Sequence, residues 1–185
     1  MNEVEVFNDD SYVIRSLLSP DHCQELIDMS EEIGYIDAPI TGMHGPVMRP
    51  DMRNNERVIL DSQDLAKSMF DMVREFVPIR SSGRSPIGLN ERFRFYRYDI
   101  GQQFNWHYDG AFERANKERS LTTLIFYLND GYEGGETEFL DFSVKGGIGD
   151  AFFFRHKQRH RGAPVTKGRK YVLRTDVMYS APIAS

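Results

Sequence analysis

In residues 92–98, RFRFYRY, every second position from Arg92 to Tyr98 carries arginine or tyrosine, and Phe93 and Phe95 lie between them. A period of two is typical of a β-strand, whose successive side chains leave opposite faces of the sheet. We therefore expect the polar row on one face and both phenylalanines on the other. Three later segments are also rich in β-branched and aromatic residues: LTTLIFYLND (121–130), DAFFFRH (150–156) and KYVLRTDVMY (170–179).

The first part of the chain has helical periodicity instead. Ser19 can cap a helix with Pro20 in its first turn and Gly34 at its end. A second helix is predicted over about 62–77, stopped by Pro78. The first helix has four apolar positions that recur on one face: Cys23, Leu26, Ile27 and Ile33.

Residues 36–56 are rich in Pro, Gly and Asn and show no periodicity, so they are interpreted as a long loop. Helices placed early and strands placed late predict a mainly β (α+β) fold. It is expected to be a double-stranded β-helix, or jelly roll, with the N-terminal helices packed on one sheet. We expect one domain over 1–185, with residues 1–84 as helical support and loop and 85–180 as the jelly-roll core.

A metal-binding pattern stands out in FNWHYDG (104–110). His107 and Asp109 are two residues apart, so both side chains leave the same face of an extended strand. His160 follows some fifty residues later. Two imidazoles and one carboxylate on one face of an octahedron leave open positions for a chelating cosubstrate and for O2, as in the non-haem iron(II) oxygenases.

The flanking sequence strengthens this interpretation. YDIG (98–101) precedes the His-x-Asp pair, and three segments follow it: YLND (127–130), GGETEF (134–139) and HRGAPV (160–165). In order and spacing, residues 85–180 resemble the 2-oxoglutarate- and iron(II)-dependent dioxygenases, in particular their prolyl 4-hydroxylase-like branch.

The resemblance implies a hydroxylase that inserts oxygen into a C–H bond and releases succinate and CO2. Iron(II) would be held by His107, Asp109 and His160, with 2-oxoglutarate and O2 as cosubstrates and ascorbate as a further candidate cofactor. Tyr98 and Tyr127 match positions that contact 2-oxoglutarate.

A basic residue about ten positions past the distal His binds the far carboxylate of 2-oxoglutarate in that family, and Lys170 matches it. Strand parity turns Lys170 and Arg174 to one face, so Arg174 shares the role or exchanges it with Lys170. Arg169 lies on the opposite face, where a solvated edge cation is the simpler interpretation. His156 shares the strand face of His160, but the HRGAPV segment favours His160 as the ligand.

The even-numbered row of the strand predicts the substrate contacts. If Tyr98 faces the cosubstrate, then Asn90, Arg92 and Arg94 face the barrel interior. Buried cations need carboxylates, so the substrate would carry an acidic group. The alternative is internal pairing with carboxylates of the protein, for instance Glu136 or Glu138. The 36–56 loop, which contains Arg53, can close over the same mouth. Residues 110–119 are either a lid or an ordinary hairpin loop.

Composition limits the partners. The chain has 185 residues, a net charge of −5 and the single cysteine Cys23, which excludes an internal disulfide framework and suits a reducing, cytoplasmic setting. The acidic N-terminus lacks the apolar core of a signal peptide, and no membrane span is expected. Seven basic residues cluster in 155–170, but they surround the cosubstrate cations, so a small-molecule, peptide or protein substrate is favoured over nucleic acid. A zinc or manganese hydrolase or isomerase would not need the cosubstrate pocket that Tyr98, Tyr127 and the Lys170/Arg174 pair supply. A catalytically silent ligand-binding or sensor jelly roll would be expected to lose a metal ligand, and none is lost here.

Overall fold

The strand predicted over residues 92–98 is β8 (Arg92–Tyr98), which lies inside a large antiparallel sheet. Its neighbours are β6 (Glu56–Asp61) and β17 (Lys170–Tyr179), which come from opposite ends of the chain. The structure, a computed structural model, describes residues 2–42, 45–78 and 81–182.

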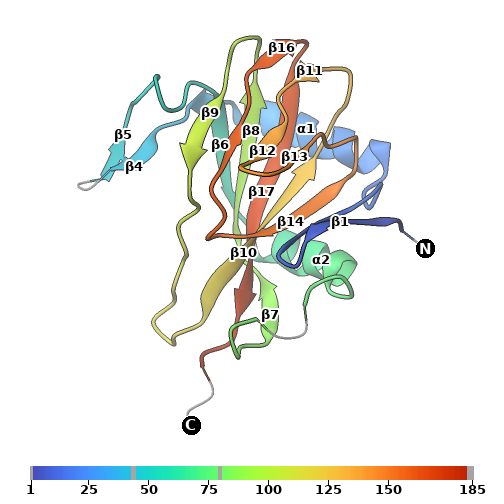
Figure 1. Cartoon of the computed structure of the whole chain (residues 1–185), viewed down its shortest axis with the longest axis vertical. Helices are drawn as coiled ribbons and strands as arrows, with labels where there is room; N and C mark the ends of the chain where they lie inside the picture. The colour runs from blue at the N-terminus through green and yellow to red at the C-terminus, as the bar shows by residue number, and fades with distance from the viewer. Residues whose placement is uncertain (1, 43–44, 79–80, 183–185) are drawn as a thin grey trace.

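Two sheets make up most of the described chain (Figure 1). In those residues the large sheet has nine strands, in the order β1 (Val4–Asn8), β2 (Ser11–Ile14), β14 (Ala151–Arg155), β10 (Arg119–Tyr127), β17, β8, β6 and β3 (Ile36–Asp37), with β7 (Pro86–Leu89) paired to β17. The smaller sheet has the order β13 (Ser143–Val144), β12 (Thr137–Phe139), β15 (His160–Gly162) and β9 (Phe104–His107). Two short pairs complete the strands, β11 (Glu133–Gly134) with β16 (Val165–Lys167) and β4 (Ile40–Gly42) with β5 (Gly45–Val47).

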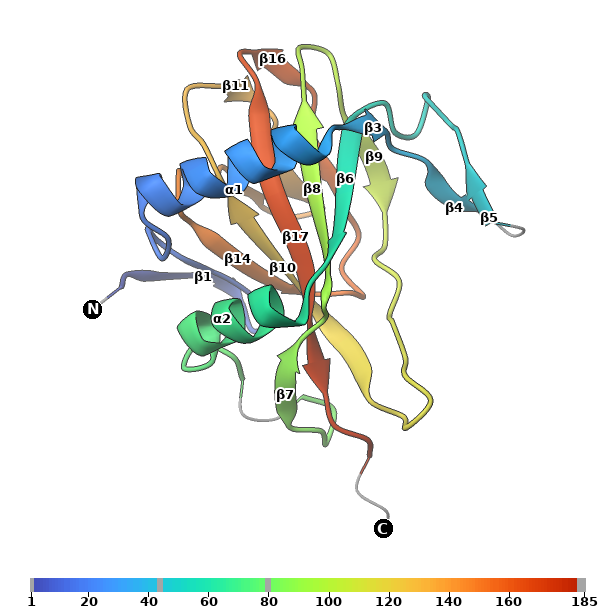
Figure 2. The same cartoon turned by 180° about the vertical axis from the view of Figure 1, so that it is seen from behind.

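The large sheet has a helix-facing and a site-facing side. Figure 2 shows α1 (Pro20–Ile33) and α2 (Gln63–Val73) lying across the side opposite the smaller sheet. Phe93 and Phe95 belong to the buried cluster that includes apolar residues of both helices. Tyr96 and Tyr98 belong to a second cluster, together with residues of the smaller sheet. The predicted jelly roll with helices on one sheet, and the parity of this strand, are confirmed.

Capping explains where the helices begin. The Ser19 side chain accepts a hydrogen bond from the backbone N–H of His22, and Ser62 does the same for Leu65. Gly34 ends α1 with a φ of 93°, a conformation that glycine adopts without strain. Two details of the predictions are wrong: Ile33 is 48% exposed, and α2 ends at Val73, before the expected stop at Pro78.

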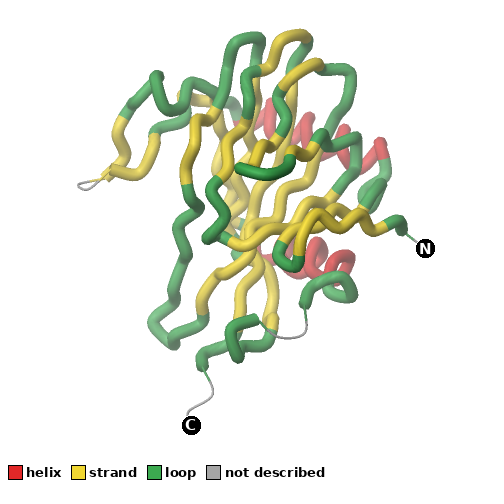
Figure 3. The backbone as a smooth tube through the Cα atoms, viewed as in Figure 1, coloured by secondary structure: helices red, strands yellow, loops and turns green. Residues whose placement is uncertain are grey.

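The first 84 residues contribute more strand than predicted (Figure 3). The expected loop over 36–56 contains β3, β4 and β5 and the first residue of β6. These strands are two or three residues long, too short to show a period. β3 is stabilised by pairing with the more distant β6, whereas β4 and β5 pair with each other. Likewise β1 and β2 extend the edge of the large sheet. Among the described residues, no helix has both the length and the apolar character needed to cross a membrane.

Candidate active site

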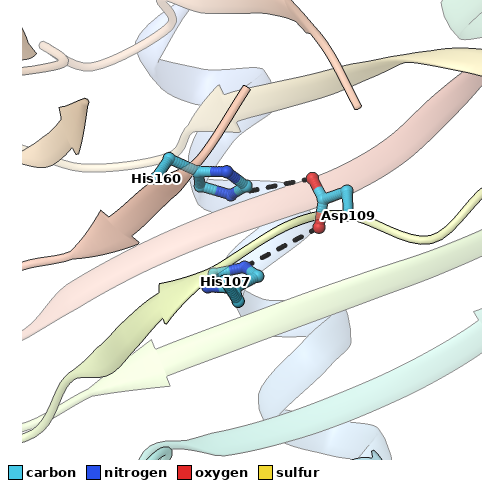
Figure 4. A group of neighbouring side chains, drawn as sticks. All are labelled: His107, Asp109 and His160. Atoms are coloured by element: carbon cyan, nitrogen blue, oxygen red, sulfur yellow. Dashed lines mark ion pairs between the residues drawn. The ribbon is translucent and has the colours of Figure 1, made fainter. Parts of the chain in front are cut away.

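The three residues of the predicted metal site come together between the two sheets. His107 is the last residue of β9 and is directly paired with His160, the first residue of β15. The strand ends before Asp109, but the carboxylate still turns back toward both imidazoles, as Figure 4 shows. Asp109 Oδ1 lies 3.7 Å from His107 Nε2, and Asp109 Oδ2 lies 3.7 Å from His160 Nε2. One ligand atom from each residue falls within 4.8 Å of the others, a spacing that one ion can bridge.

Hydrogen bonds to the backbone orient both imidazoles. His107 Nδ1 lies 2.7 Å from the carbonyl of Asn105, and His160 Nδ1 lies 3.1 Å from the carbonyl of Gln158. A carbonyl only accepts, so each Nδ1 carries the proton and each Nε2 presents a lone pair toward Asp109. Two lone pairs and a carboxylate facing one another repel unless a cation lies between them. The donor set therefore fits a divalent metal ion.

Burial sets the charge state of these groups. It lowers the pKa of His107 to about 3, with the neighbouring His160 adding to the effect, and it also lowers the pKa of His160. Burial alone would raise the pKa of Asp109, but the guanidinium of Arg174 holds it well below its usual range. At neutral pH the site therefore has two neutral imidazoles and one carboxylate, the protonation state that a metal ion requires.

Asp109 is positioned by Thr123, which we did not predict as a site residue, and by Arg174, which we predicted as a cosubstrate contact. Thr123 Oγ1 donates a hydrogen bond of 2.6 Å to Asp109 Oδ2. Arg174 Nη2 lies 3.1 Å from Asp109 Oδ1 and equally 3.1 Å from Asp176 Oδ1. No motif marks Thr123 or Asp176; the β10–β17 register places them opposite each other.

Lys170 lines the same cavity as the three proposed metal ligands. Its Nζ donates to the carbonyl of Gly135 at 2.6 Å and lies 5.3–5.8 Å from the ring centroids of three tyrosines: Tyr98, Tyr127 and Tyr132. Burial lowers the pKa of Lys170 to about 8, against the opposing effect of Glu136. In the part of the chain that the structure describes, this ammonium has no carboxylate within ion-pair distance.

Tyr98 lines the cavity directly, whereas Tyr127 acts through a neighbour. The Tyr127 hydroxyl lies 2.8 Å from Oγ1 of Thr137, and it is Thr137 that faces the cavity. Lys170 and Arg174 share one strand face, as predicted, and both line the cavity. Their partners differ, because Lys170 donates to the Gly135 carbonyl and Arg174 pairs with Asp109. Because Arg174 is bound to Asp109 and Asp176, its position argues against the expectation that it shares the far carboxylate of 2-oxoglutarate. Arg169 pairs with Asp99 at the surface.

The three residues predicted to bind the substrate do not lie together. Arg94 lines a neighbouring cavity, but Arg92 is exposed and pairs with Asp61, and Asn90 is buried with its side-chain oxygen on the N–H of Arg92. Neither Asn90 nor Arg92 lines that cavity or the one that holds Lys170. Arg92 is the first residue of β8 and Asn90 precedes the strand, so both lie at the end distant from Tyr98.

The alternative of internal pairing fits both arginines, but in the described residues the carboxylates are Asp61 for Arg92 and Asp176 for Arg94, not Glu136 or Glu138. Arg94 is nearest to Asp176, at 3.9 Å, and Glu138 pairs with Arg161. His156 is buried against Asp176, with 3.5 Å between Nε2 and Oδ1, and does not line the cavity of His160.

Residues 110–119 form a loop that is held by hydrogen bonds and ion pairs. Ser120 exchanges hydrogen bonds with the backbone of Phe112, and Arg114 forms ion pairs with Glu91 and Glu118. These contacts favour the hairpin-loop interpretation over the lid.

Comparison with known proteins agrees with this architecture. The profile of the 2OG-Fe(II) oxygenase superfamily matches residues 93–175. A PKHD-type hydroxylase of Delftia acidovorans is 31% identical over 171 residues, covering 85% of this chain and 74% of that protein. Probable prolyl 4-hydroxylase 3 of Arabidopsis thaliana is 23% identical, covering 87% of this chain and 66% of that protein.

Solved structures share the fold. A viral collagen prolyl hydroxylase from Paramecium Bursaria Chlorella virus-1, in complex with 2OG, superposes with a TM-score of 0.67 at 23% identity and covers 92% of this chain and 97% of its own. A Pseudomonas putida prolyl-4-hydroxylase gives a TM-score of 0.68 at 16% identity, covering 91% of this chain and 92% of its own. The resemblance inferred from the sequence motifs is thus confirmed: the chain belongs to the 2OG-Fe(II) oxygenase superfamily, among its prolyl 4-hydroxylase-like, 2-oxoglutarate-dependent hydroxylases.

Proposed function

We propose that His107, Asp109 and His160 hold one iron(II) ion and that the protein hydroxylates a C–H bond of its substrate. The observation that carries this proposal is the pair of Nε2 lone pairs directed at a buried carboxylate. Bound iron(II) would supply the O2 chemistry that couples decarboxylation of 2-oxoglutarate, giving succinate and CO2, to insertion of one oxygen atom into the substrate.

Lys170 is the proposed partner of the far carboxylate of 2-oxoglutarate. A buried ammonium without a carboxylate of its own is suited to an anionic ligand, because an unpaired buried charge is costly. Tyr98 would line the cosubstrate between Lys170 and the metal ligands, and Tyr127 would orient the Thr137 hydroxyl toward it. Arg174 and Thr123 would hold the Asp109 carboxylate in place, each through its own oxygen.

Aromatic walls would keep this site poor in water. Phe104 stacks on His107 with 3.6 Å between ring centroids, and Phe139 and Phe154 pack against the ring of His160. A low-dielectric wall strengthens the charge interactions of Lys170 and Arg174 with their partners. The jelly roll supplies this environment because the site lies between its two sheets.

The substrate would be an amino acid, a protein residue such as proline, or a small metabolite. The relatives named above are prolyl and PKHD-type hydroxylases, and a prolyl hydroxylase of Trichoplax adhaerens, similar in fold, was solved with a peptide fragment. Ascorbate is proposed as a reductant that keeps the iron ferrous. A reducing cytoplasm suits the buried, single Cys23. A silent module is not favoured, because His107, Asp109, His160 and Lys170 all line one cavity, which supports the proposed roles.

Loading the protein anaerobically with iron(II) and 2-oxoglutarate, then adding O2, tests the proposal. We expect succinate to form, and a substrate in the mixture to gain the mass of one oxygen atom. Asp109→Ala should abolish both iron binding and succinate formation. Asp71→Ala, which removes an exposed carboxylate of α2, is the matched control and should leave both unchanged. Tight iron binding and undiminished succinate formation by Asp109→Ala would show that the ligand assignment is wrong.

A further inference from the structure

A second cavity, of about 440 Å³, lies beside the metal ligands. His107 and Asp109 line it from one side, so it opens directly onto the proposed iron site. Its other walls come from β6, β8 and β17, three neighbouring strands of the large sheet (Figure 2), and from the segment before β6. Four arginines line it: Arg53, Arg57, Arg94 and Arg174.

Each of these guanidinium groups has a buried nitrogen without a hydrogen-bond partner in the described residues. These nitrogens are Arg53 Nη2, Arg57 Nε, Arg94 Nη1 and Arg174 Nε. Arg53 is the most enclosed, with 4% of its surface exposed. Its Nε donates to Asn55 Oδ1 at 2.7 Å, and its guanidinium carbon lies 4.3 Å from the ring centroids of Tyr96 and Phe104. A rigidly held, buried Arg that lines a cavity and keeps an N–H without a partner in the described residues is a ready donor for an anion.

Positive charge outweighs negative charge around this cavity. Arg94 and Arg174 occupy directly opposite positions on β8 and β17, an arrangement that like charges disfavour. Asp109 and Asp176 compensate Arg174, and Asp176 lies 3.9 Å from Arg94. Arg53 and Arg57 have no acidic partner within ion-pair distance in the described chain.

The pKa shifts agree with an excess of positive charge. Burial and the neighbouring arginines lower the pKa of Arg57. Burial alone would raise the pKa of Tyr96, but the combined effect of Arg53, Arg174 and Arg94 lowers it. The adjacent acidic residue, Glu56, is directed to Arg97 instead, at 2.7 Å. The protein thus keeps uncompensated cations next to its reaction centre.

We propose that this arginine-lined cavity is the substrate subsite and that it binds a carboxylate close to the C–H bond to be hydroxylated. The substrate class is then an acidic amino acid or an acidic residue within a peptide. This inference rests on the proposed function, since the iron site defines where the reacting carbon must lie. Guanidinium groups bind a carboxylate through two parallel hydrogen bonds, so several of them facing one cavity would fix both the charge and the orientation of the substrate.

Ligand binding to the protein loaded anaerobically with iron(II) and 2-oxoglutarate tests the inference by calorimetry. The acidic probes are L-aspartate, L-glutamate and a doubly capped Asp-Pro-Asp peptide, each compared with its amide counterpart. We expect at least one acid to bind roughly tenfold more tightly than its amide, because a charge-assisted pair is lost in the amide. Whether the free amino acids or the capped peptide show the preference distinguishes the two sources of the carboxylate.

Variants of the cavity arginines supply the control. Arg57→Gln and Arg94→Gln should each remove most of the acid preference. Arg92→Gln removes the same charge from the same strand but from a side chain that is exposed and paired with Asp61, so it should keep the preference. No acid preferred by the wild type, or a preference unchanged in both cavity variants, would overturn the inference.

A second measurement needs neither iron nor turnover. The thermal midpoint of the metal-free protein is compared in malonate and in sodium chloride of equal ionic strength. Malonate should raise the midpoint of the wild type and of Arg92→Gln more than that of Arg57→Gln. An equal rise of the thermal midpoint in all three proteins would overturn the inference, but it would not count against the proposed function, which succinate formation tests. Conversely, absence of succinate formation would count against the proposed function and leave the malonate result standing.

Discussion

Asp109 has its two oxygens held by different partners, and this makes Thr123 a positioning residue that can be tested alone. Thr123→Val removes the 2.6 Å hydrogen bond to Oδ2 and leaves Arg174 on Oδ1. We expect iron(II) affinity to fall about tenfold to a hundredfold, as is usual when a residue that orients a metal ligand is lost. Competition with a chromogenic chelator measures it.

The neighbouring Thr122 provides the matched control for this prediction. Its hydroxyl lies 3.3 Å from the Tyr179 hydroxyl and makes no contact with the metal ligands. Thr122→Val should therefore keep the wild-type iron affinity. Equal iron affinity of Thr123→Val and the wild type would show that the hydrogen bond to Asp109 has no role in metal binding.

Lys170 should make the binding of 2-oxoglutarate dependent on pH. Burial lowers the pKa of this lysine to about 8 in the folded protein, below its ordinary value of 10.5. Between these values the unfolded chain binds more protons than the folded one, so this group makes the free energy of unfolding rise with pH across that window. The ligand, in contrast, needs the protonated form. Affinity for 2-oxoglutarate should therefore be full below pH 8 and fall above it.

Calorimetric titration of the iron-loaded protein at several pH values measures this dependence. Lys170→Met removes the charge, and a buried carboxylate that loses its cation costs on the order of 3–5 kcal/mol. The variant should bind 2-oxoglutarate at least a hundredfold more weakly and without the decline above pH 8. The same pH profile in both proteins would mean that another group titrates.

At the scale of elements, the connection between β13 and β14 supports the cosubstrate cavity through Tyr127. A Cβ added at Gly146 would lie 2.1 Å from ring carbons of Tyr127, so the ring would have to move. Gly146→Ala should lower the free energy of unfolding by about 1–3 kcal/mol, as overpacking does. It should also weaken 2-oxoglutarate binding, because the Tyr127 hydroxyl holds Thr137. Urea denaturation and calorimetry measure the two effects.

The adjacent glycine separates this contact from a general effect of alanine in the connection. At Gly147 the nearest atom to an added Cβ is Asp150 Oδ2, at 3.5 Å, an ordinary van der Waals distance. Gly147→Ala should leave both stability and cosubstrate affinity close to the wild-type values. If Gly146→Ala behaved in the same way, the close packing of Tyr127 on this connection would be wrong.

For the whole molecule, the two faces of the large sheet should separate stability from chemistry. Phe95 is fully buried in the cluster shared with the helices. Phe95→Ala should lower the free energy of unfolding by about 3–5 kcal/mol, measured by urea denaturation. Because the side chain faces away from the site, the fraction that remains folded should bind iron(II) with wild-type affinity.

Phe112 is the control for that prediction because 43% of its surface is exposed. Phe112→Ala should change the free energy of unfolding by no more than about 0.5 kcal/mol. A large loss of iron affinity in folded Phe95→Ala would show that the helix-facing core and the metal site are coupled, against the division into two faces.

The sequence by itself determined the features that depend on near neighbours along the chain. Alternation in residues 92–98 predicted which face of β8 carries Phe93 and Phe95, and the Ser19 cap predicted the start of α1, because both follow from local backbone geometry. The His-x-Asp pair with a distant His predicted the cluster that the fold assembles. The basic residue ten positions past that His was likewise correctly expected to line the same cavity.

Only the tertiary structure decided which charges meet. The register of β6 and β8 places Asp61 opposite Arg92 and takes that arginine away from the site, and the register of β8 and β17 places Arg94 opposite Arg174. The short strand β3 likewise forms by pairing with the distant β6. The physical reason is common to all of these. An ion pair or a strand pair depends on the distance between segments far apart in sequence, and periodicity within one segment carries no information about that distance.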